Sequence, residues 1–493
     1  MTLSKRIINT IIENPQHSFF LTKSQSQWWR YSGNQLYNSF LHSRNVLINN
    51  GVKKGDRVAF KGKNSPEWVS WNLACNSLGG IWVPMYNDQS KDYCKYVLKD
   101  SDPTVFISDD KQQNDLNYSY LPSSIPSFSY QNPNIPYVDH DFINNEIATL
   151  IYTSGTTGNP KGVMLSNDNI LSNIYTIRDR FYDYENNISL NILPWAHIYS
   201  QTCELYFNLL FKNTVALSSS RDNFIKECRE VRPHILYVVP RILELIKAKV
   251  EKFDKPIIKY LLPKILSYIF GGKIKYLFVG GAKINNECKN FYLKNGFIIC
   301  EGYGCTETSP MVSVNHYNSP RNINTIGKIL DNVCVEIINN EIQVSGPNVM
   351  LGYWRNKEAT DQVLVNRNNN IWYKTGDSGY IDYQNFLYYE GRISENYKLA
   401  NGKFVNVADI ESKLKNMGIE NPIIFGENQL NNQLITTSEN KPNLLNKINS
   451  NLESYLKISI IHSITQEELN PFFTPKMSIK RKELINYIER NLK

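Results

Sequence analysis

Residues 147–165 read Ile147-Ala-Thr-Leu-Ile-Tyr-Thr153-Ser-Gly-Thr-Thr-Gly158-Asn-Pro-Lys161-Gly-Val-Met-Leu165. An apolar run of strand length leads into a loop of hydroxyl residues and glycines that contains one lysine. Glycines let a backbone come close to a ligand, and successive N–H groups with Ser and Thr hydroxyls form an anion-binding nest. The lysine adds a point charge suited to a polyphosphate. The residues expected to contact phosphate are Thr153, Ser154, Gly155, Thr156, Thr157, Gly158 and Lys161.

The same segment has an alternative interpretation as a plain Gly/Ser/Thr turn between a strand and a helix. It also differs from the phosphate loop of P-loop NTPases, because the Gly-x4-Gly-Lys-Ser/Thr spacing of that loop does not occur in the chain.

On both sides of this segment, apolar runs alternate with longer helical patterns, which predicts an α/β fold with a mostly parallel sheet and helices on its faces. The proline-rich stretch Pro122–Tyr137 is expected to be a surface connector inside this domain. Segments that belong to the alternation are Arg57–Phe60, Glu67–Ser77, Thr104–Ser108, Ile147–Tyr152, Ile235–Val239, Ile274–Val279 and Phe297–Cys300.

After about residue 327 the chain changes to short β-like runs joined by Asn, Gly and Asp turns, which predicts a β-rich subdomain. The final stretch ends in a helical pattern, Lys482–Leu492, with its apolar residues on one side. We therefore expect a large domain over residues 1–393, with helix-flanked sheets and the β-rich subdomain, and a small α+β domain over residues 394–493. The β-like runs are Val333–Ile338, Glu341–Val344, Ile371–Tyr373, Tyr380–Asp382 and Phe386–Tyr389.

Composition excludes several classes of protein. The 493 residues carry 54 Lys and Arg against 46 Asp and Glu, a net charge of +8 without a basic arm, so nucleic acid is not an expected partner. Hydrophobic residues make up 41% of the chain, which excludes wholesale disorder. The eight cysteines have no CxxC spacing, and we find neither a secretory signal nor an apolar run of the roughly 18 residues that span a membrane. These features predict a cytoplasmic protein with reduced thiols.

Further motifs follow one another along nearly the whole chain. In this order they resemble the signature motifs of adenylate-forming enzymes, which include acyl-CoA synthetases, non-ribosomal peptide adenylation domains and firefly luciferase. Each motif alone is weak, but the series in register is highly specific. The motifs are Lys54–Ala59, Asn64–Trp68, Ile151–Gly162, Leu193–Ile198, Val239–Arg241, Val279–Ala282, Glu301–Pro310, Gly346–Trp354, Tyr373–Asp377, Gly391–Arg392 and Asn401–Asn406.

The resemblance implies a two-step reaction. A carboxylate is a poor electrophile, and attack on the α-phosphate of ATP converts it into an acyl adenylate with AMP as leaving group. A thiol such as that of CoA then takes the acyl group. The in-line displacement gathers negative charge on phosphate oxygens, so positioned cations and Mg²⁺ are expected to supply most of the stabilisation.

The resemblance also implies roles for individual residues around the nucleotide. Glu307 matches the Mg²⁺ ligand, in keeping with the one or two carboxylates that Mg²⁺ usually takes from a protein. Tyr303 is expected to stack on adenine and Asp377 to accept the ribose hydroxyls, with Arg392 nearby. The other expected nucleotide contacts are Gly281, Ala282, Gly304 and Thr306.

His197, in Leu193-Pro-Trp-Ala-His-Ile198, is expected to lie between the acyl substrate and the nucleotide. The apolar and aromatic residues around it suit an acyl channel, and they suit plain core equally well. The residues of this motif resemble those of long-chain fatty acid–CoA ligases, and so do the residues of Tyr397-Lys-Leu-Ala-Asn-Gly-Lys-Phe-Val405.

Two positions depart from the family pattern. The hinge position, usually Asp or Lys, is Ser394, which keeps the conformational freedom of a hinge but not the charge. The C-terminal catalytic lysine falls in Thr474-Pro-Lys-Met-Ser-Ile-Lys-Arg-Lys482, where the register places it at Ser478 or Lys480. We predict Lys480, with Lys476 and Lys482 as the other candidates, and we expect Lys398 and Gly402 on the CoA side of a mobile small domain.

The predicted function is therefore that of an ATP- and Mg²⁺-dependent fatty acid–CoA ligase. Two alternatives stay open at this point: a ligase that loads a carrier-protein thiol, and a non-catalytic relative that binds nucleotide or acyl adenylate. Apolar residues and lysines in Lys255–Phe278 suggest peripheral contact with the cytoplasmic membrane face, and an ordinary packed helix is the alternative there.

Overall fold

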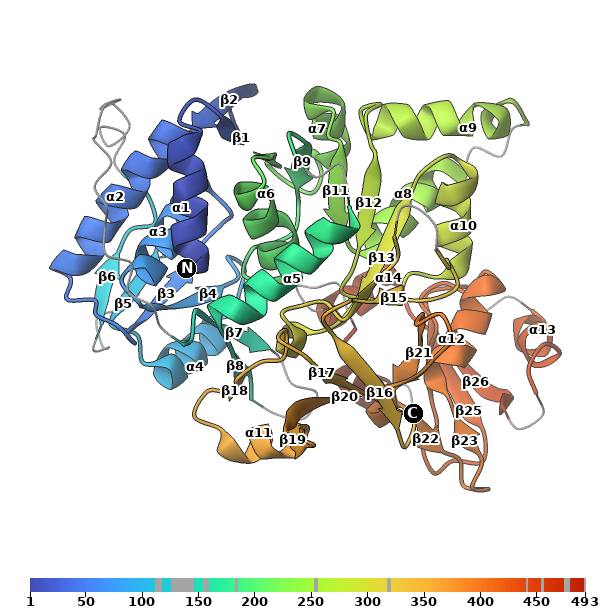
Figure 1. The fold of residues 1–493 in the computed structure, drawn as a ribbon. Helices are drawn as coiled ribbons and strands as arrows, with labels where there is room; N and C mark the ends of the chain where they lie inside the picture. The colour runs from blue at the N-terminus through green and yellow to red at the C-terminus, as the bar shows by residue number, and fades with distance from the viewer. Residues whose placement is uncertain are drawn as a thin grey trace.

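The computed structural model of the protein describes residues 1–110, 118–125, 146–153, 159–181, 185–251, 256–316, 321–439, 442–453, 456–473 and 479–491, with the backbone alone for residues 256–259 and 404. These parts form two large sheets with their helices, a β-rich subdomain and a small C-terminal unit, as Figure 1 shows.

The glycine-rich segment lies in a seven-stranded sheet of order β18-β8-β7-β4-β3-β5-β6. Five strands, β7, β4, β3, β5 and β6, run parallel, and β8 returns antiparallel to β7 so that Lys161 pairs with Thr153. The loop therefore joins two strands and not a strand and a helix. The strands are β3 (Arg57–Lys61), β4 (Ile81–Met85), β5 (Val105–Ser108), β6 (Ser119–Leu121), β7 (Thr149–Thr153), β8 (Lys161–Leu165) and β18 (Gly352–Tyr353).

A nine-stranded sheet of order β15-β14-β13-β12-β11-β9-β10-β1-β2 forms the second layer. Its central strands, from β13 to β1, are parallel, and β2, β14 and β15 are antiparallel additions at the edges. The strands are β1 (Ser18–Ser24), β2 (Gln27–Ser32), β9 (Ile188–Asn191), β10 (Thr214–Leu217), β11 (Ile235–Val238), β12 (Tyr276–Val279), β13 (Ile299–Tyr303), β14 (Ser313–Val314) and β15 (Lys328–Ile329).

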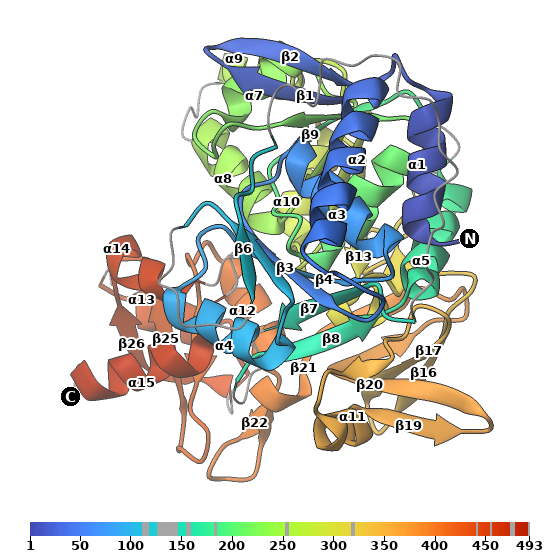
Figure 2. The ribbon, with the colours of Figure 1, turned by 90° about the vertical axis from the view of Figure 1, so that its left-hand side faces the viewer.

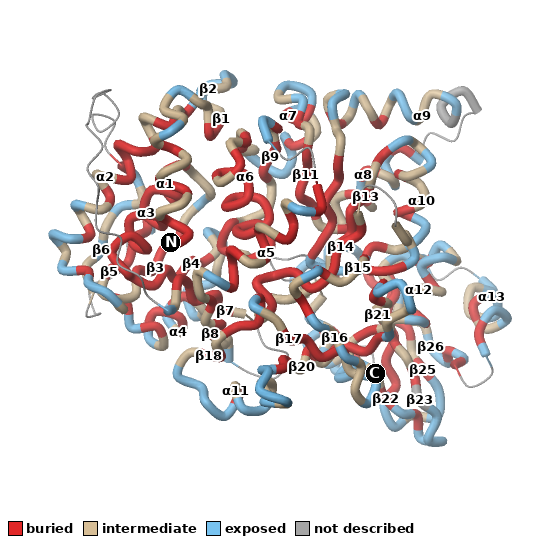
Figure 3. The backbone as a smooth tube through the Cα atoms, viewed as in Figure 1, coloured by how far each residue is buried: buried red, intermediate tan, exposed pale blue. Residues whose placement is uncertain are grey.

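One hydrophobic core joins the facing sides of the two sheets. In β11, Ile235 and Tyr237 belong to this shared core, whereas Leu236 and Val238 face the helices on the outer side. This alternation follows from the two-residue period of a strand. Figure 3 shows the buried chain running through the centre of the large domain. Helices in the shared core are α1 (Leu3–Glu13), α2 (Gly33–Asn49), α3 (Pro66–Ser77) and α5 (Asn167–Arg180).

Other helices cover the outer faces (Figures 1 and 2). On the nine-stranded sheet they are α7 (Phe224–Val231), α8 (Pro240–Glu251), α9 (Pro256–Ile269) and α10 (Asn286–Lys294). On the seven-stranded sheet α4 (Lys91–Ser101) packs through Cys94, Val97 and Leu98. None of the helices in the described residues has the length and apolar character needed to cross a bilayer.

Capping residues fix where the inner helices begin. Ser32 and Gln35 form a capping box at the start of α2, in which the side chain of each residue accepts a hydrogen bond from the backbone N–H of the other. In α3, Ser65 caps the first turn and Pro66 occupies the position where its missing N–H costs nothing. Nearly all residues of α3 are buried, so its apolar side chains occur on every face of the helix and not on one face only. The helix thereby carries Trp68 between the two sheets.

A π-helical segment, η2 (Ser200–Tyr206), follows the Leu193–Ile198 motif and continues into α6 (Phe207–Leu210). All residues of η2 are buried, including Glu204, whose Oε2 accepts hydrogen bonds from Asn191 Nδ2 at 2.6 Å and Ser200 Oγ at 3.0 Å. Burial raises the pKa of Glu204 to about 8, so its carboxyl group is mostly neutral at pH 7. Single π-turns of this kind often occur next to functional sites.

The β-rich subdomain contains a five-stranded sheet in which β20 pairs with β17, β19 and β21. The sequence analysis predicted two separate strands at Ile371–Tyr373 and Tyr380–Asp382, and this was wrong, because the first run and Tyr380–Ile381 of the second lie in the single twelve-residue β20. Gly376, at φ +70°, and a register shift at Ser378 let the strand continue through residues that resemble a turn. The elements are β16 (Cys334–Ile338), β17 (Glu341–Ser345), α11 (Lys357–Val363), β19 (Leu364–Arg367), β20 (Asn370–Ile381) and β21 (Leu387–Arg392).

Residues after β21 form an α+β unit with two apolar cores of its own. One core contains Val405, Ile410 and Leu434, and the other contains Ile423 and Leu484. The predicted C-terminal helix is present as α15. The elements are η4 (Ile393–Glu395), β22 (Tyr397–Lys398), β23 (Phe404–Val405), α12 (Val407–Asn416), β24 (Ile423–Phe425), β25 (Asn432–Thr436), α13 (Leu444–Asn449), β26 (Ile458–Ser463), α14 (Gln466–Leu469), η6 (Asn470–Phe472) and α15 (Arg481–Asn491).

Candidate functional site

A cavity of about 330 Å³ opens where strands of both large sheets end. Carboxyl ends of parallel strands are where ligands bind in open α/β sheets. Thr153 ends β7, Gly280 and Gly281 follow β12, and Tyr303 ends β13. Predicted site residues that line the cavity are Thr153, Lys161, His197, Gly281, Tyr303, Gly304, Thr306, Glu307 and Arg392.

Asp377, Arg392 and Tyr303 form a hydrogen-bonded group at the subdomain side of the cavity. Asp377 and Arg392 pair across β20 and β21, and the Tyr303 hydroxyl donates to Asp377 Oδ2 at 2.6 Å. Arg392 Nε lies 3.1 Å from Oδ1, yet this buried oxygen accepts no aligned hydrogen bond among the described residues. A carboxylate oxygen in this condition is suited to accept hydroxyl groups of a ligand.

Burial raises the pKa of the Asp377 carboxyl group to about 6, with the positive charge of Arg392 opposing part of the shift. The same ion pair raises the pKa of the Arg392 guanidinium against its own burial. Asp377 is therefore charged at neutral pH and begins to take up a proton at mildly acidic pH.

Glu307 lies opposite this group and is held by a residue that the sequence analysis did not single out. The Tyr353 hydroxyl donates to Glu307 Oε1 at 2.8 Å, and Lys161 Nζ lies 5.0 Å from the centre of the Tyr353 ring. Tyr353 is in β18, which pairs with β8 and so lies beside Lys161. A cation over the ring face and a carboxylate at the ring hydroxyl are thus both in contact with Tyr353, and all three residues line the cavity.

The site around Glu307 offers a metal ion a single carboxylate ligand. The described residues contain no cluster of three or more His, Cys, Asp or Glu side chains that could hold a metal by themselves. Mg²⁺ commonly takes one or two carboxylates from the protein and its remaining ligands from phosphates and water. The single carboxylate of Glu307 therefore fits an ion that is shared with a phosphate ligand.

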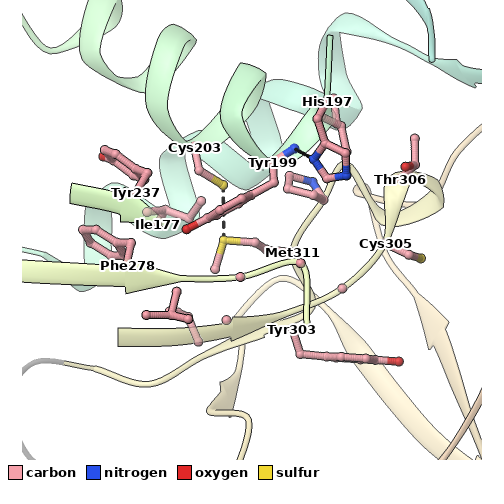
Figure 4. Close-up of a pocket in the computed structure, with 18 of the residues that line it drawn as sticks. Ile177, His197, Tyr199, Cys203, Tyr237, Phe278, Tyr303, Cys305, Thr306 and Met311 are labelled. Carbon is pink, nitrogen blue, oxygen red and sulfur yellow. Dashed lines mark hydrogen bonds between the residues drawn. The ribbon is translucent and has the colours of Figure 1, made fainter. Parts of the chain in front are cut away.

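His197 projects into the middle of the cavity from the loop before η2. Its Nδ1 accepts the backbone N–H of Tyr199 at 3.2 Å, which assigns the proton of the neutral ring to Nε2. Figure 4 shows His197 near Thr306, with Tyr199 between it and the aromatic end that holds Tyr237 and Phe278. The ring can therefore donate a hydrogen bond from Nε2 to a ligand in the cavity.

Backbone geometry at the Tyr303 end depends on glycine. Gly281 has φ +81°, a left-handed conformation that favours glycine, and it lines the cavity. A Cβ at Gly304 would lie 1.9 Å from the Pro310 carbonyl oxygen, so only glycine fits there. Thr306 begins the short turn that carries Glu307. Ala282 is exposed and is not among the residues that line the cavity.

Some of the predicted site residues are not among those that the structure describes. Ser154, Gly155, Thr156, Thr157 and Gly158 fall outside the described residues, as do Lys476 and Ser478.

Lys480 stands just before α15 on the surface of the small unit, where its Nζ pairs with Glu483 at 3.1 Å. Ser394 is exposed in η4, Lys398 is exposed in β22, and Gly402 turns between β22 and β23 with φ +79°. None of these four lines the cavity as the structure describes it.

Tyr353 and Tyr373 are among the cavity-lining residues that the sequence analysis did not single out, whereas Tyr199 was one of the aromatic residues expected to suit an acyl channel or plain core. Tyr353 and Tyr373 stand inside motifs that were recognised, but a tyrosine within a motif does not reveal which way its ring points. Tyr199 directly follows the His197 motif. With these residues the cavity has a polar end suited to a nucleotide and an aromatic end suited to an apolar acid.

Comparisons with known proteins agree with this geometry. A long-chain-fatty-acid–CoA ligase of Mycobacterium bovis is 28% identical over 434 residues, which cover 75% of this chain and 70% of that protein. ATP-bound MatB from Rhodopseudomonas palustris has the same fold, with a TM-score of 0.83 at 21% identity over 100% of both chains.

O-succinylbenzoate coenzyme A synthetase from Bacillus subtilis, in complex with ATP and magnesium ion, has a TM-score of 0.79 at 20% identity over 97% of this chain and 99% of that one. The predicted α/β fold class is thus confirmed. The family model described as AMP-binding enzyme matches residues 12–354. This match spans more than half of the sequence, so the predicted family membership is confirmed. The chain belongs to the AMP-binding family of adenylate-forming enzymes.

Proposed function

We propose that this protein is an ATP-dependent acid–CoA ligase that acts on medium- or long-chain fatty acids. The observation that carries the proposal is the cavity itself, which has charged side chains at one end, where Tyr303 and Arg392 hold the Asp377 carboxylate, and an aromatic chamber at the other. The likeness to a long-chain-fatty-acid–CoA ligase supports the choice of substrate.

In this proposal the nucleotide occupies the polar end. Tyr303 stacks on adenine while its hydroxyl keeps Asp377 oriented, and Asp377 accepts the ribose hydroxyls. Gly281 and Ala282 leave room for the base. The hydroxyls and N–H groups of the loop from Thr153 to Gly158, together with Lys161, bind the phosphates.

The acid occupies the other end, with its carboxylate near His197. The Nε2–H group of His197 orients an oxygen between acid and α-phosphate, and the closed aromatic wall excludes water that would hydrolyse the adenylate. Mg²⁺ held through Glu307 would neutralise phosphate charge. The carboxylate oxygen attacks the α-phosphorus, pyrophosphate leaves, and the thiol of CoA then displaces AMP from the acyl carbon.

We also propose that residues 394–493 form a separate lid that moves about Ser394. Among the described residues, a polar contact that joins it to the large domain is Arg241 Nη1 to Asn421 Oδ1 at 3.5 Å. A rotation would bring Lys480 to the α-phosphate in the first step, and the Lys398–Gly402 hairpin toward the CoA side in the second.

Peripheral contact with a membrane is part of the same proposal. Tyr260 and Tyr268 of α9 are 83% and 65% exposed, and Arg229 and Lys264 lie beside them. Aromatic rings and basic groups on one surface suit an anionic bilayer.

The first prediction tests the activity through Glu307. Glu307→Ala should reduce ATP–pyrophosphate exchange with fatty acids by at least ~100-fold, the scale of losing one oriented electrostatic group. Glu358→Ala, at an exposed position in α11, is the control and should keep full activity. CoA and a holo carrier protein are then compared as acyl acceptors. Exchange without any thioester product would leave an adenylate-forming enzyme but refute the CoA ligase.

The second prediction concerns pH. Because the pKa of Asp377 lies near 6 in the free protein, protonation below that pH removes the charge that accepts ribose hydroxyls. The kcat/KM for ATP should fall by up to about tenfold per pH unit below pH 6 and level off above pH 7. Asp377→Asn should be weaker at every pH and should lack this inflection. An unchanged inflection in the variant would assign it to another group.

The third prediction separates the two steps. Lys480→Ala should slow adenylation strongly and leave thioester formation from supplied acyl adenylate intact, whereas Ser394→Pro should impair the second step, because a fixed φ near −65° holds the hinge. Lys476→Ala and Lys482→Ala are the controls. Loss of adenylation in a control variant instead of in Lys480→Ala would correct the register of the lysine.

The fourth prediction concerns the membrane. The protein should float with anionic phosphatidylserine vesicles at physiological salt, and a Tyr260→Ser/Tyr268→Ser variant should float several-fold less. Tyr383→Ser, at a position 93% exposed in the β-rich subdomain, is the matched control. Absence of the wild-type protein from the floating fraction would refute this contact.

A further inference from the structure

The aromatic end of the cavity contains a polar atom without a hydrogen-bond partner, the hydroxyl oxygen of Tyr199. The residue is 8% exposed and lines the cavity, and its hydroxyl makes no hydrogen bond to any described residue. Figure 4 shows the ring extending from the His197 loop toward Ile177, Tyr237 and Phe278, away from the nucleotide end. Buried tyrosine hydroxyls usually have a partner, so this one needs an explanation.

The ring of Tyr199 is fixed by its surroundings and not by its hydroxyl. It lies flat against Gly280, where a Cβ would come within 3.0 Å of Tyr199 Cζ. Its backbone N–H donates to His197 Nδ1, which holds the start of the side chain. A phenylalanine ring would fill the same space, so packing alone does not require the oxygen.

The surrounding wall consists mainly of aromatic rings and sulfur-containing side chains, and no charged residue of the described cavity lies in it. Tyr237 stacks on Phe278 with ring centres 5.2 Å apart, and Cys203 Sγ lies 3.4 Å from Met311 Sδ. Burial raises the pKa of the Tyr199 hydroxyl well above its ordinary value, so the group stays protonated. The charged residues that line the described cavity, Lys161, Glu307 and Arg392, belong to the nucleotide end. A partner for the phenol must therefore be a neutral oxygen of the ligand, or water.

A saturated alkyl chain offers no such oxygen. It would displace water from the hydroxyl and leave the phenol buried without a hydrogen bond, which lowers affinity. A chain with a hydroxyl or keto group at the matching position would replace the water and keep the bond. Sites that hydrogen-bond a substrate group discriminate strongly against the analogue that lacks it.

We propose that Tyr199 is a specificity-determining residue, and that the substrate is an oxygenated acid with a hydroxyl or keto group along an otherwise apolar chain. The phenol of Tyr199 donates to that oxygen in the aromatic end of the cavity. This inference rests on the proposed ligase function and narrows its substrate class.

The test is ATP–pyrophosphate exchange with one saturated straight-chain acid and its positional monohydroxy and keto isomers of equal length. In the wild-type protein at least one isomer should exceed the parent acid in kcat/KM by about tenfold or more. Tyr199→Phe should abolish this preference by lowering kcat/KM for the isomer and keeping or raising it for the parent. The thermal midpoint of the variant should not fall, since the ring is retained.

Tyr206→Phe is the matched control, because Tyr206 is a buried tyrosine of the neighbouring turn that donates to Asn72 and does not line the cavity. It should leave the ratio of isomer to parent unchanged. Equal or higher kcat/KM for the parent at every position, with no change in Tyr199→Phe, would overturn the inference while the ligase function stands. Absence of exchange with all acids would instead refute the proposed function.

Discussion

The packing of aromatic rings between the two large sheets is the interaction on which the rest of the structure depends. Trp68 of α3 lies 5.2 Å from Trp82 of β4 and 5.7 Å from Trp195, measured between ring centres, and Trp195 in turn lies 5.9 Å from Phe20 of β1. This chain of contacts joins both sheets through one helix and carries the loop of His197 with it. Asn64 adds polar support, since its side chain bonds both the N–H of Trp195 and the carbonyl of Leu193.

Because these rings fix one sheet against the other, the carboxyl ends of their strands open into a common cavity. Its two ends differ in physical character. Charged groups lie where β20 and β21 meet the end of β13, and burial there raises the pKa of the Asp377 carboxyl group to about 6. The other end is enclosed by rings and sulfur atoms, with hydroxyls but no charge among its described residues. A ligand that has a charged head and an uncharged tail fits this division with little desolvation of unpaired charge.

The small C-terminal unit has a different relation to this centre. Its cores are separate from those of the large domain, and a polar contact between the two parts is that of Arg241 Nη1 with Asn421 Oδ1 at 3.5 Å. An interface of this kind is compatible with relative movement, whereas the aromatic contacts between the sheets are not. Lys480 is exposed on the surface of this unit, where it pairs with Glu483.

The family, the α/β class and the nature of most groups at the nucleotide end could be predicted from the sequence, because short motifs in a fixed order constrain which side chains follow each strand. That Ile371–Tyr373 and Tyr380–Ile381 form one strand could not be predicted, because a bulge at Ser378 has no distinct local pattern. Packing in three dimensions connects Lys161 with Glu307 through Tyr353, and it leaves the Tyr199 hydroxyl in an aromatic chamber without a hydrogen-bond partner among the described residues. These contacts join residues far apart in the chain, and their geometry arises from packing, which no local pattern of residues encodes.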